Sequence, residues 1–233
     1  MERYVIGPLA RMRTAVARVL ARIGRRGEGP GRDFDGSASY WESRYNSGGD
    51  SGAGSYGVVA EFKAQVLNDL IAEQGLQRVI EFGCGDGNQL GMLAVKDYVG
   101  LDVSPTVIAA CRQRYATDRS KSFILIEGGN IPIGLPPADL ALSLDVVYHL
   151  VEDEVYAAYM SALFDHSRRF VVVFAPNENR TDLPLHMRYR RFTDWVDAGK
   201  PDWRLARTID NPHKQFPLTL ADFYVFERRP GRS

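Results

Sequence analysis

The segment VIEFGCGDGNQL at residues 79–90 combines an apolar run, the acid Glu81 and three alternating glycines, Gly83, Gly85 and Gly87. Glycine lacks a Cβ atom, so it permits tight turns and close approach of a ligand to backbone N–H groups at the start of a helix. The spacing is G-x-G-x-G, which differs from the G-x-G-x-x-G of dinucleotide-binding proteins. A second acid, Asp102, ends the next apolar run, twenty-one residues after Glu81. An acid there is placed to accept hydrogen bonds from ribose hydroxyls, so the pattern predicts a nucleoside site.

A second group of residues that could do chemistry lies in ADLALSLDVVYHLVEDE at residues 138–154. Asp145 and His149 follow an apolar run there, and open α/β sheets bind ligands beyond the carboxyl ends of their strands. An imidazole that titrates near neutrality can accept a hydroxyl proton, so His149 is a candidate general base. The alternative is that His149 caps or packs against the next helix. Asp145 could orient His149, contact a cofactor or help to hold Mg²⁺, although no compact group of carboxylates marks a metal site.

Other polar and aromatic residues are candidates for acceptor contacts. They are His186, Arg188 and Arg190 in HMRYRRFTDWV (186–196), and Tyr56, Tyr40 and Trp41 nearer the start of the chain. Arginine offers planar, multidentate donors for hydroxylated or anionic ligands, but these arginines are equally consistent with a solvated basic turn. The aromatic side chains could stack on a sugar, close over a cofactor or dock onto the core.

The elements that must position these residues alternate along the chain. Short apolar runs follow amphipathic stretches, which predicts a doubly wound, Rossmann-like α/β sheet with helices on both faces. Ser104 and Pro105 supply an N-cap and a first-turn proline for one helix. The expected strands are 78–82, 98–101, 122–126, 139–144, 170–175, 203–208 and 222–228, and the expected helices include 58–75, 88–95, 104–115 and 152–164.

Together these motifs resemble those of the class I methyltransferases that use S-adenosylmethionine (SAM). The first motif of that family, [DE]-x-G-x-G-x-G, is matched by Glu81 and the three glycines, and the second by Asp102. EGGNIP (127–132) lies where the family lines the adenine, with Gly-Gly-Asn in place of a common Asp, and the likeness assigns Asn130 there. Leu144 falls in the segment that faces methionine and acceptor. The resemblance covers roughly residues 58–228 and implies SAM binding by a seven-stranded sheet whose last strand is antiparallel.

A narrower resemblance is carried by SGAGSYG (51–57), HMRYRRFTDWV and DFYVFE (222–227). These segments are similar to bacterial methyltransferases of glycan and polysaccharide biosynthesis, some of which methylate sugar hydroxyls, including those of mannose oligosaccharides. The likeness implies transfer of a methyl group to a hydroxyl of a small molecule, above all a saccharide, with Mg²⁺ as an optional cofactor. Two alternatives stay open: an N- or O-methyltransferase of another small metabolite, and a SAM-binding interaction module without catalysis.

The apolar pattern of the N-terminal residues indicates how the chain divides into domains. Residues 8–24 place apolar side chains at helical spacing, which predicts an N-terminal amphipathic helix and linker over 1–35. A methyltransferase domain is then expected at 36–233, with a lid at 36–57. The N-terminal helix could pack on the core, form a homodimer contact or lie on an anionic membrane surface, and its lack of Trp and Phe favours a protein contact.

Composition and charge also indicate which partners and which cellular compartment to expect. The formal net charge is zero, but residues 1–32 hold eight arginines against two glutamates, so the remainder is acidic. This balance, with the absence of an Asn-Pro-Pro-Tyr-like signature, argues against a nucleic-acid partner. The two cysteines have no metal-type spacing and the N-terminus lacks a signal-peptide pattern, which together predict a cytoplasmic protein.

Overall fold

The computed structural model describes residues 34–127, 134–180, 182–214 and 219–230. The chain divides into two units, Met1–Asp33 and Phe34–Ser233, and the description concerns the second. The predicted N-terminal helix and Asn130 both lie outside the described residues. Within these residues, none of the helices has the length and apolar composition that crossing a membrane would require.

One seven-stranded sheet, in the order β3-β2-β1-β4-β5-β7-β6, organises the described chain. Its strands are β1 (Arg78–Phe82), β2 (Asp97–Asp102), β3 (Lys121–Leu125), β4 (Ala138–Leu144), β5 (Ser167–Ala175), β6 (Trp203–Ile209) and β7 (Asp222–Arg228). Strands β3, β2, β1, β4 and β5 pair in parallel, whereas β7 runs antiparallel to both β5 and β6. The predicted fold class is confirmed, including the antiparallel last strand.

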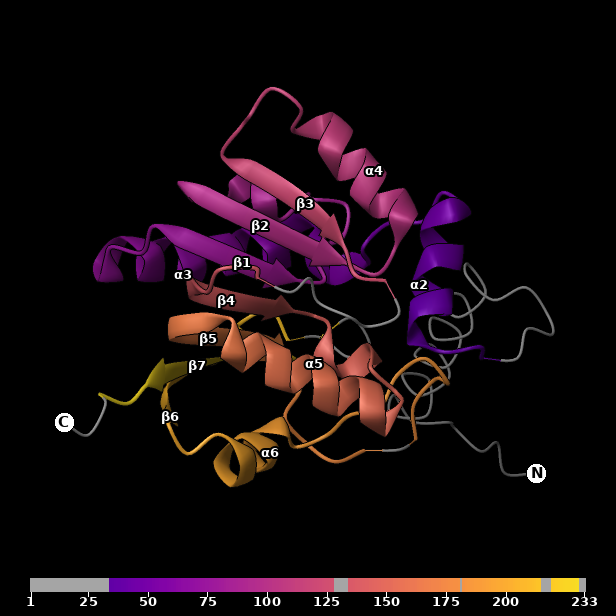
Figure 1. Ribbon diagram of the computed structural model, residues 1–233. Helices are drawn as coiled ribbons and strands as arrows, with labels where there is room; N and C mark the ends of the chain where they lie inside the picture. Colours follow the sequence, from indigo (N-terminus) through magenta and orange to yellow (C-terminus); the bar gives the residue numbers. More distant parts are fainter. Residues whose placement is uncertain (1–33, 128–133, 181, 215–218, 231–233) are drawn as a thin grey trace, which may run out of the picture. The chain divides into compact units, whose positions relative to one another are not determined.

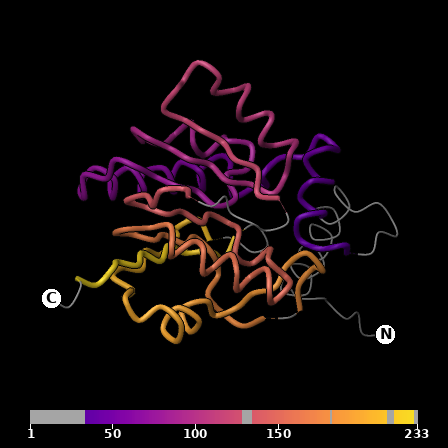
Figure 2. The backbone as a smooth tube through the Cα atoms, in the orientation of Figure 1, coloured from indigo at the N-terminus to yellow at the C-terminus, as the bar shows by residue number. Residues whose placement is uncertain are grey.

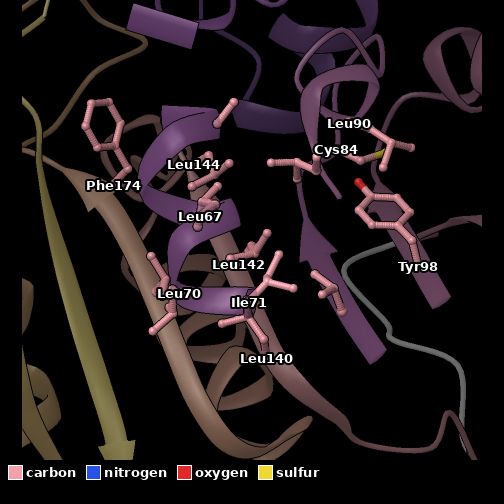
Figure 3. Packing of buried hydrophobic residues seen from close by; sticks show 14 of the residues in the cluster. Leu67, Leu70, Ile71, Cys84, Leu90, Tyr98, Leu140, Leu142, Leu144 and Phe174 are labelled. Atoms are coloured by element: carbon pink, nitrogen blue, oxygen red, sulfur yellow. The ribbon is translucent and has the colours of Figure 1, made fainter. Parts of the chain in front are cut away.

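Helices cover both faces of this sheet (Figure 1). Buried side chains of α3 (Gly57–Gln74) and α4 (Pro105–Arg114) belong to one core cluster, and those of α5 (Asp153–Asp165) and α6 (Phe192–Gly199) to the other. Figure 3 shows the first cluster, in which Leu67 and Ile71 of α3 lie over Leu140, Leu142 and Leu144 of β4. Both clusters exclude water from nearly continuous apolar strands, as expected for a parallel core.

Local sequence patterns predict the start of α4 correctly, but they predict one helix that does not form. The Ser104 hydroxyl accepts a hydrogen bond from the Val107 N–H at 3.1 Å, so the predicted N-cap of α4 is confirmed. The helix expected over 88–95 is wrong, because only the 3₁₀ turn η2 (Leu90–Met92) forms. Asn68 of α3 bonds to the Met92 carbonyl at 2.9 Å and the Ala94 N–H at 2.7 Å. These side-chain bonds hold the segment in a turn, and Gly91 within it is a poor helix former.

Two segments far apart in the sequence meet at the carboxyl edge of the sheet. The arrowheads of β1, β2 and β3 point toward α2 (Ser37–Asn46), which precedes the 3₁₀ turn η1 (Ala53–Ser55) (Figure 1). The segment between β5 and α6, orange in Figure 2, returns to this edge. The ring of Tyr40 on α2 stacks on His186 of that segment, with centroids 4.3 Å apart. The fold therefore closes the end of the sheet where a ligand is expected.

Candidate active site

A cavity of about 780 Å³ lies at the carboxyl ends of β1, β2 and β4. This volume is typical of small-molecule sites. Its walls include seven of the residues that the sequence predicts for the site: Glu81, Gly83, Gly85, Asp102, Leu144, Asp145 and His149. They also include Trp41 and Tyr45 of α2 and Lys63 of α3. The structure thus brings the two predicted motifs together with a helix that precedes both of them.

The glycine loop after β1 fits the close approach of a ligand. Gly83 and Gly85 have φ of 80° and 55°, a backbone region that L side chains rarely adopt. A Cβ atom on Gly85 would lie 2.3 Å from the Ser51 hydroxyl oxygen, and one on Gly83 would lie 2.6 Å from a methyl carbon of Val146. Any side chain here would displace the neighbouring segments. Gly87, with φ of 72°, packs against Cys111 and lies outside the cavity lining.

Asp102 joins this loop to the end of β2. Its carboxylate accepts hydrogen bonds from the backbone N–H groups of Gly85 and Ser104, each at 3.0 Å. Burial raises the pKa of Asp102, and these backbone donors counteract part of the rise. Each carboxylate oxygen can accept more than one bond, so acceptor capacity remains for the ribose hydroxyls of a nucleoside.

Glu81 lies beneath the loop in a buried environment. The Tyr98 hydroxyl donates to Glu81 Oε2 at 2.5 Å. Burial raises the pKa of Glu81 to about 7, although the Tyr98 bond and the nearby Lys63 ammonium act in the opposite direction. The protonation state of Glu81 therefore changes near neutrality, where it can either accept or donate a hydrogen bond at the cofactor loop.

A buried ion pair, which the sequence analysis did not identify, connects α3 to the end of β4. Lys63 Nζ lies 2.8 Å from Asp145 Oδ2, and the side chains are 1% and 10% exposed. The Tyr148 hydroxyl donates to the other Asp145 oxygen at 3.0 Å. Asp145 has φ of 59°, a strained conformation for a residue other than glycine. Both residues line the cavity, and each neutralises the charge of the other.

His149 ends the 3₁₀ turn η3 (Val147–His149), and its Nδ1 lies 3.1 Å from the carbonyl oxygen of His186. A carbonyl oxygen can only accept, so Nδ1 carries the hydrogen and Nε2 keeps its lone pair. Burial lowers the pKa of His149 to about 4. The imidazole is therefore neutral at physiological pH, and its ring stands edge-on to Trp41 with centroids 4.9 Å apart. Asp145, which the sequence offered as a group that could orient His149, instead accepts from Lys63 and Tyr148, and His149 Nδ1 bonds to the His186 carbonyl.

The residues predicted for acceptor contacts separate into two groups. His186 acts through its carbonyl, whereas Arg188 and Arg190 line a separate surface pocket. The Arg190 guanidinium donates to the Leu150 carbonyl at 2.6 Å and lies 4.4 Å from the centre of the Tyr156 ring. Arg188 and Arg190 both pair with Asp153 at 3.0 Å. In these contacts the arginines fasten their segment to the start of α5, and neither reaches the cavity wall.

Residues 36–57, predicted as a lid, contact the core on several sides. The Ser37 hydroxyl donates to Glu152, and Glu42 accepts from Ser104 and Thr106 at the start of α4. The Tyr56 hydroxyl donates to Asp86 of the glycine loop at 2.5 Å. Tyr56 is 38% exposed and is not part of the cavity wall. Its contact is therefore with the loop that holds the cofactor site.

The sequence left Mg²⁺ open as an optional cofactor, with Asp145 as a candidate ligand. Among the described residues, no group of three or more His, Cys, Asp or Glu side chains is arranged to hold a metal ion. The Asp145 carboxylate, the metal-ligand candidate of the sequence, is paired with Lys63.

The strand order, the glycine loop after β1 and the acid ending β2 have the arrangement of the class I SAM-dependent methyltransferase fold. Residues 80–171 match the family model described as a methyltransferase domain.

Comparisons with individual proteins agree on this fold. The chain is 24% identical over 143 residues to a tRNA (carboxymethyluridine(34)-5-O)-methyltransferase of Arabidopsis thaliana, covering 58% of this chain and 33% of that protein. It thus spans about a third of that relative's length. The N-methyltransferase NodS of Bradyrhizobium japonicum WM9, in complex with S-adenosyl-L-homocysteine (SAH), superposes with a TM-score of 0.66 at 14% identity, covering 83% and 99% of the two chains. The methyltransferase domain of bacterial CtHen1-C gives 0.58 at 21% identity, covering 72% and 97%. The cofactor predicted from the sequence, SAM, is the one that this fold binds.

Proposed function

We propose that the protein transfers a methyl group from SAM to a hydroxyl of a small molecule, most specifically a saccharide. When bound, SAM supplies an electrophilic methyl on a positively charged sulfur. The acceptor oxygen forms a bond to the methyl carbon while the carbon–sulfur bond breaks, and the hydroxyl proton passes to His149 Nε2. Alignment and proton removal are then the main tasks of the protein.

The contact between His149 Nδ1 and the His186 carbonyl oxygen is the observation that carries this proposal. The His186 carbonyl fixes the hydrogen on Nδ1, so Nε2 is a proton acceptor on the cavity wall. Burial keeps the ring neutral, because it lowers the His149 pKa to about 4. A neutral, oriented imidazole favours an acceptor that must lose a proton during transfer, as a hydroxyl must.

Two further features support a saccharide. Trp41 places an aromatic ring beside His149, and aromatic rings pack well against the apolar face of a sugar. The segments 51–57, 186–196 and 222–227 resemble methyltransferases of glycan biosynthesis. The tRNA methyltransferase relative is consistent with oxygen as the methylated atom, and its own acceptor is RNA.

The proposal is tested by incubating the full chain with SAM labelled in its methyl group and a panel of uncharged oligosaccharides and small amines. We expect label on a saccharide that resists mild alkali, because methyl ethers survive conditions that hydrolyse methyl esters. Label on an amine alone would support the small-metabolite alternative. Cofactor binding without transfer to any acceptor would support the non-catalytic module.

A further inference from the structure

The wall of the cavity carries an excess of carboxylates. Among the described residues that line it, Lys63 is the one lysine or arginine, and eight residues are acidic. The acids are Asp35, Glu81, Asp86, Asp102, Glu127, Asp145, Glu152 and Glu154.

Five of these acids have partners inside the protein. Glu81 accepts from Tyr98, Asp86 from Tyr56, Asp102 from backbone N–H groups, Asp145 from Lys63 and Glu152 from Ser37. The other three are exposed at the wall of the cavity: Asp35, Glu127 and Glu154. Their side chains have no hydrogen-bond or ion-pair partner among the described residues. We call these three residues the acidic rim.

We infer that the acidic rim selects ligands by charge, admitting uncharged acceptors and excluding anionic ones. The inference rests on the proposed function and narrows its acceptor to an uncharged, polyhydroxylated molecule. Carboxylates accept hydrogen bonds from sugar hydroxyls, and Trp41 adds an aromatic surface to the same cavity. The acidic rim also attracts the cofactor. SAM carries a positive sulfonium, a positive ammonium and one negative carboxylate, so its net charge is +1.

The same electrostatics weighs against RNA as the acceptor. Proteins that bind nucleic acids neutralise phosphates with lysine and arginine side chains. In the described part of the cavity wall, Lys63 is such a cation, and it is buried against Asp145. A phosphate, sulfate or uronate group would meet the rim with like charge and lose its hydration without a partner.

The association rate of SAM tests the electrostatic effect of the acidic rim, and this measurement does not require the acceptor to be known. Stopped-flow fluorescence, with Trp41 in the cavity as reporter, is measured on the full chain at 10 mM and 1 M salt. The three negative charges of the acidic rim should raise the association rate of the cationic cofactor about fivefold at low salt, and 1 M salt should abolish the gain. SAH has no net charge, so its rate should change little.

The matched variants remove the same number of charges at different places. Glu127→Gln with Glu154→Gln should reduce the salt effect to less than twofold. Asp197→Asn with Asp210→Asn, two exposed acids outside the cavity lining, should retain the full effect. A SAM rate that does not respond to salt, or a full response in the first double variant, would overturn the inference.

Comparing a neutral acceptor with its anionic form distinguishes a failure of the charge selection from a failure of the proposed function. A neutral oligosaccharide and the same molecule carrying sulfate or uronate are compared as methyl acceptors. Methylation of the neutral form alone supports both proposals. Methylation of the anionic form at an equal or higher rate overturns the charge selection and leaves methyl transfer to a sugar standing. If neither is methylated while the SAM rate shows the expected salt effect, the charge selection stands and the saccharide acceptor fails.

Discussion

Replacing His149 by phenylalanine removes the ring nitrogen that we propose as the proton acceptor. The phenyl ring keeps the aromatic contacts with Trp41 and Tyr148, whose ring centroids lie 4.9 and 4.4 Å from that of His149. The variant loses the bond from Nδ1 to the His186 carbonyl, which costs on the order of 1 kcal/mol. Because packing is conserved, His149→Phe should fold and bind SAM with nearly unchanged affinity.

Turnover should fall by about 10²–10⁴-fold, the usual contribution of a positioned general base. The wild-type pH profile follows from the His149 pKa of about 4. Turnover should be flat from about pH 6 to pH 8 and fall only below about pH 5, rather than rise through the ordinary histidine value.

The assay is steady-state transfer of labelled methyl groups, with SAM affinity measured by calorimetry on the same samples. His213→Ala is the matched control, because His213 is exposed and outside the cavity lining. It should retain full turnover. Near-normal turnover in His149→Phe, or a wild-type rate that rises between pH 6 and 7, would refute the assignment of His149.

The same residue gives a prediction for stability. His149 has a folded pKa of about 4, below its unfolded value of 6.5, so it destabilises the fold as pH falls from 6.5 to 4. Glu81 has a folded pKa of about 7, above its unfolded value of 4.5, so it destabilises the fold as pH rises from 4.5 to 7. Each effect amounts to about 3 kcal/mol and the two offset each other. In His149→Phe the opposing histidine effect is lost, and the raised pKa values of Glu81 and Asp102 both act against stability as pH rises. Urea titrations should then show stability decreasing from pH 4.5 to 7, and a flat profile would contradict this account.

Three further changes test the cofactor site and the domain organisation. Asp102→Ala should weaken SAM binding by about 1–3 kcal/mol in calorimetry, because the carboxylate that organises the loop and is placed for the ribose is lost; unchanged affinity would remove Asp102 from the site. Lys63→Met should lower the free energy of unfolding by about 3–5 kcal/mol, since it leaves the Asp145 carboxylate buried without its cation. Lys63→Met with Asp145→Asn should recover most of this loss, because asparagine is uncharged and tolerates the positive φ at this position. Additive losses in that double variant would show that the pair is not coupled. Deleting residues 1–33 should leave a folded domain that binds SAM, and an insoluble product would place that segment in the core.

Contacts between residues close in the sequence were predictable from the chain. The glycines of residues 83–87 have positive φ, a conformation that glycine adopts without strain, so the residue type alone predicts a tight loop there. The strand pattern predicted the order of elements because buried parallel strands are apolar along their whole length. Ser104 and Pro105 marked the start of α4 because a capping bond spans only a few residues.

The helix expected over 88–95 shows where local pattern was insufficient. Its residues are compatible with a helix, but the side chain of Asn68, from another helix, hydrogen-bonds to the carbonyl of Met92 at the end of η2 and to the N–H of Ala94 just after it. Tertiary hydrogen bonds of this kind override a weak local preference.

The chemistry of the active site depended on the tertiary structure. The spacing of Asp145 and His149 suggested that the two residues pair, which requires a helical turn between them. Instead, η3 is a short 3₁₀ turn, His149 bonds to the carbonyl of His186, and the partner of Asp145 is Lys63, 82 residues earlier in the chain. A lysine within a helix gives no sequence signal that it is buried, since burial is set by what packs over it. The sequence by itself therefore determined the fold and the cofactor loop, whose requirements are local, whereas only the packing of distant segments decided the tautomer of His149 and the charge around it.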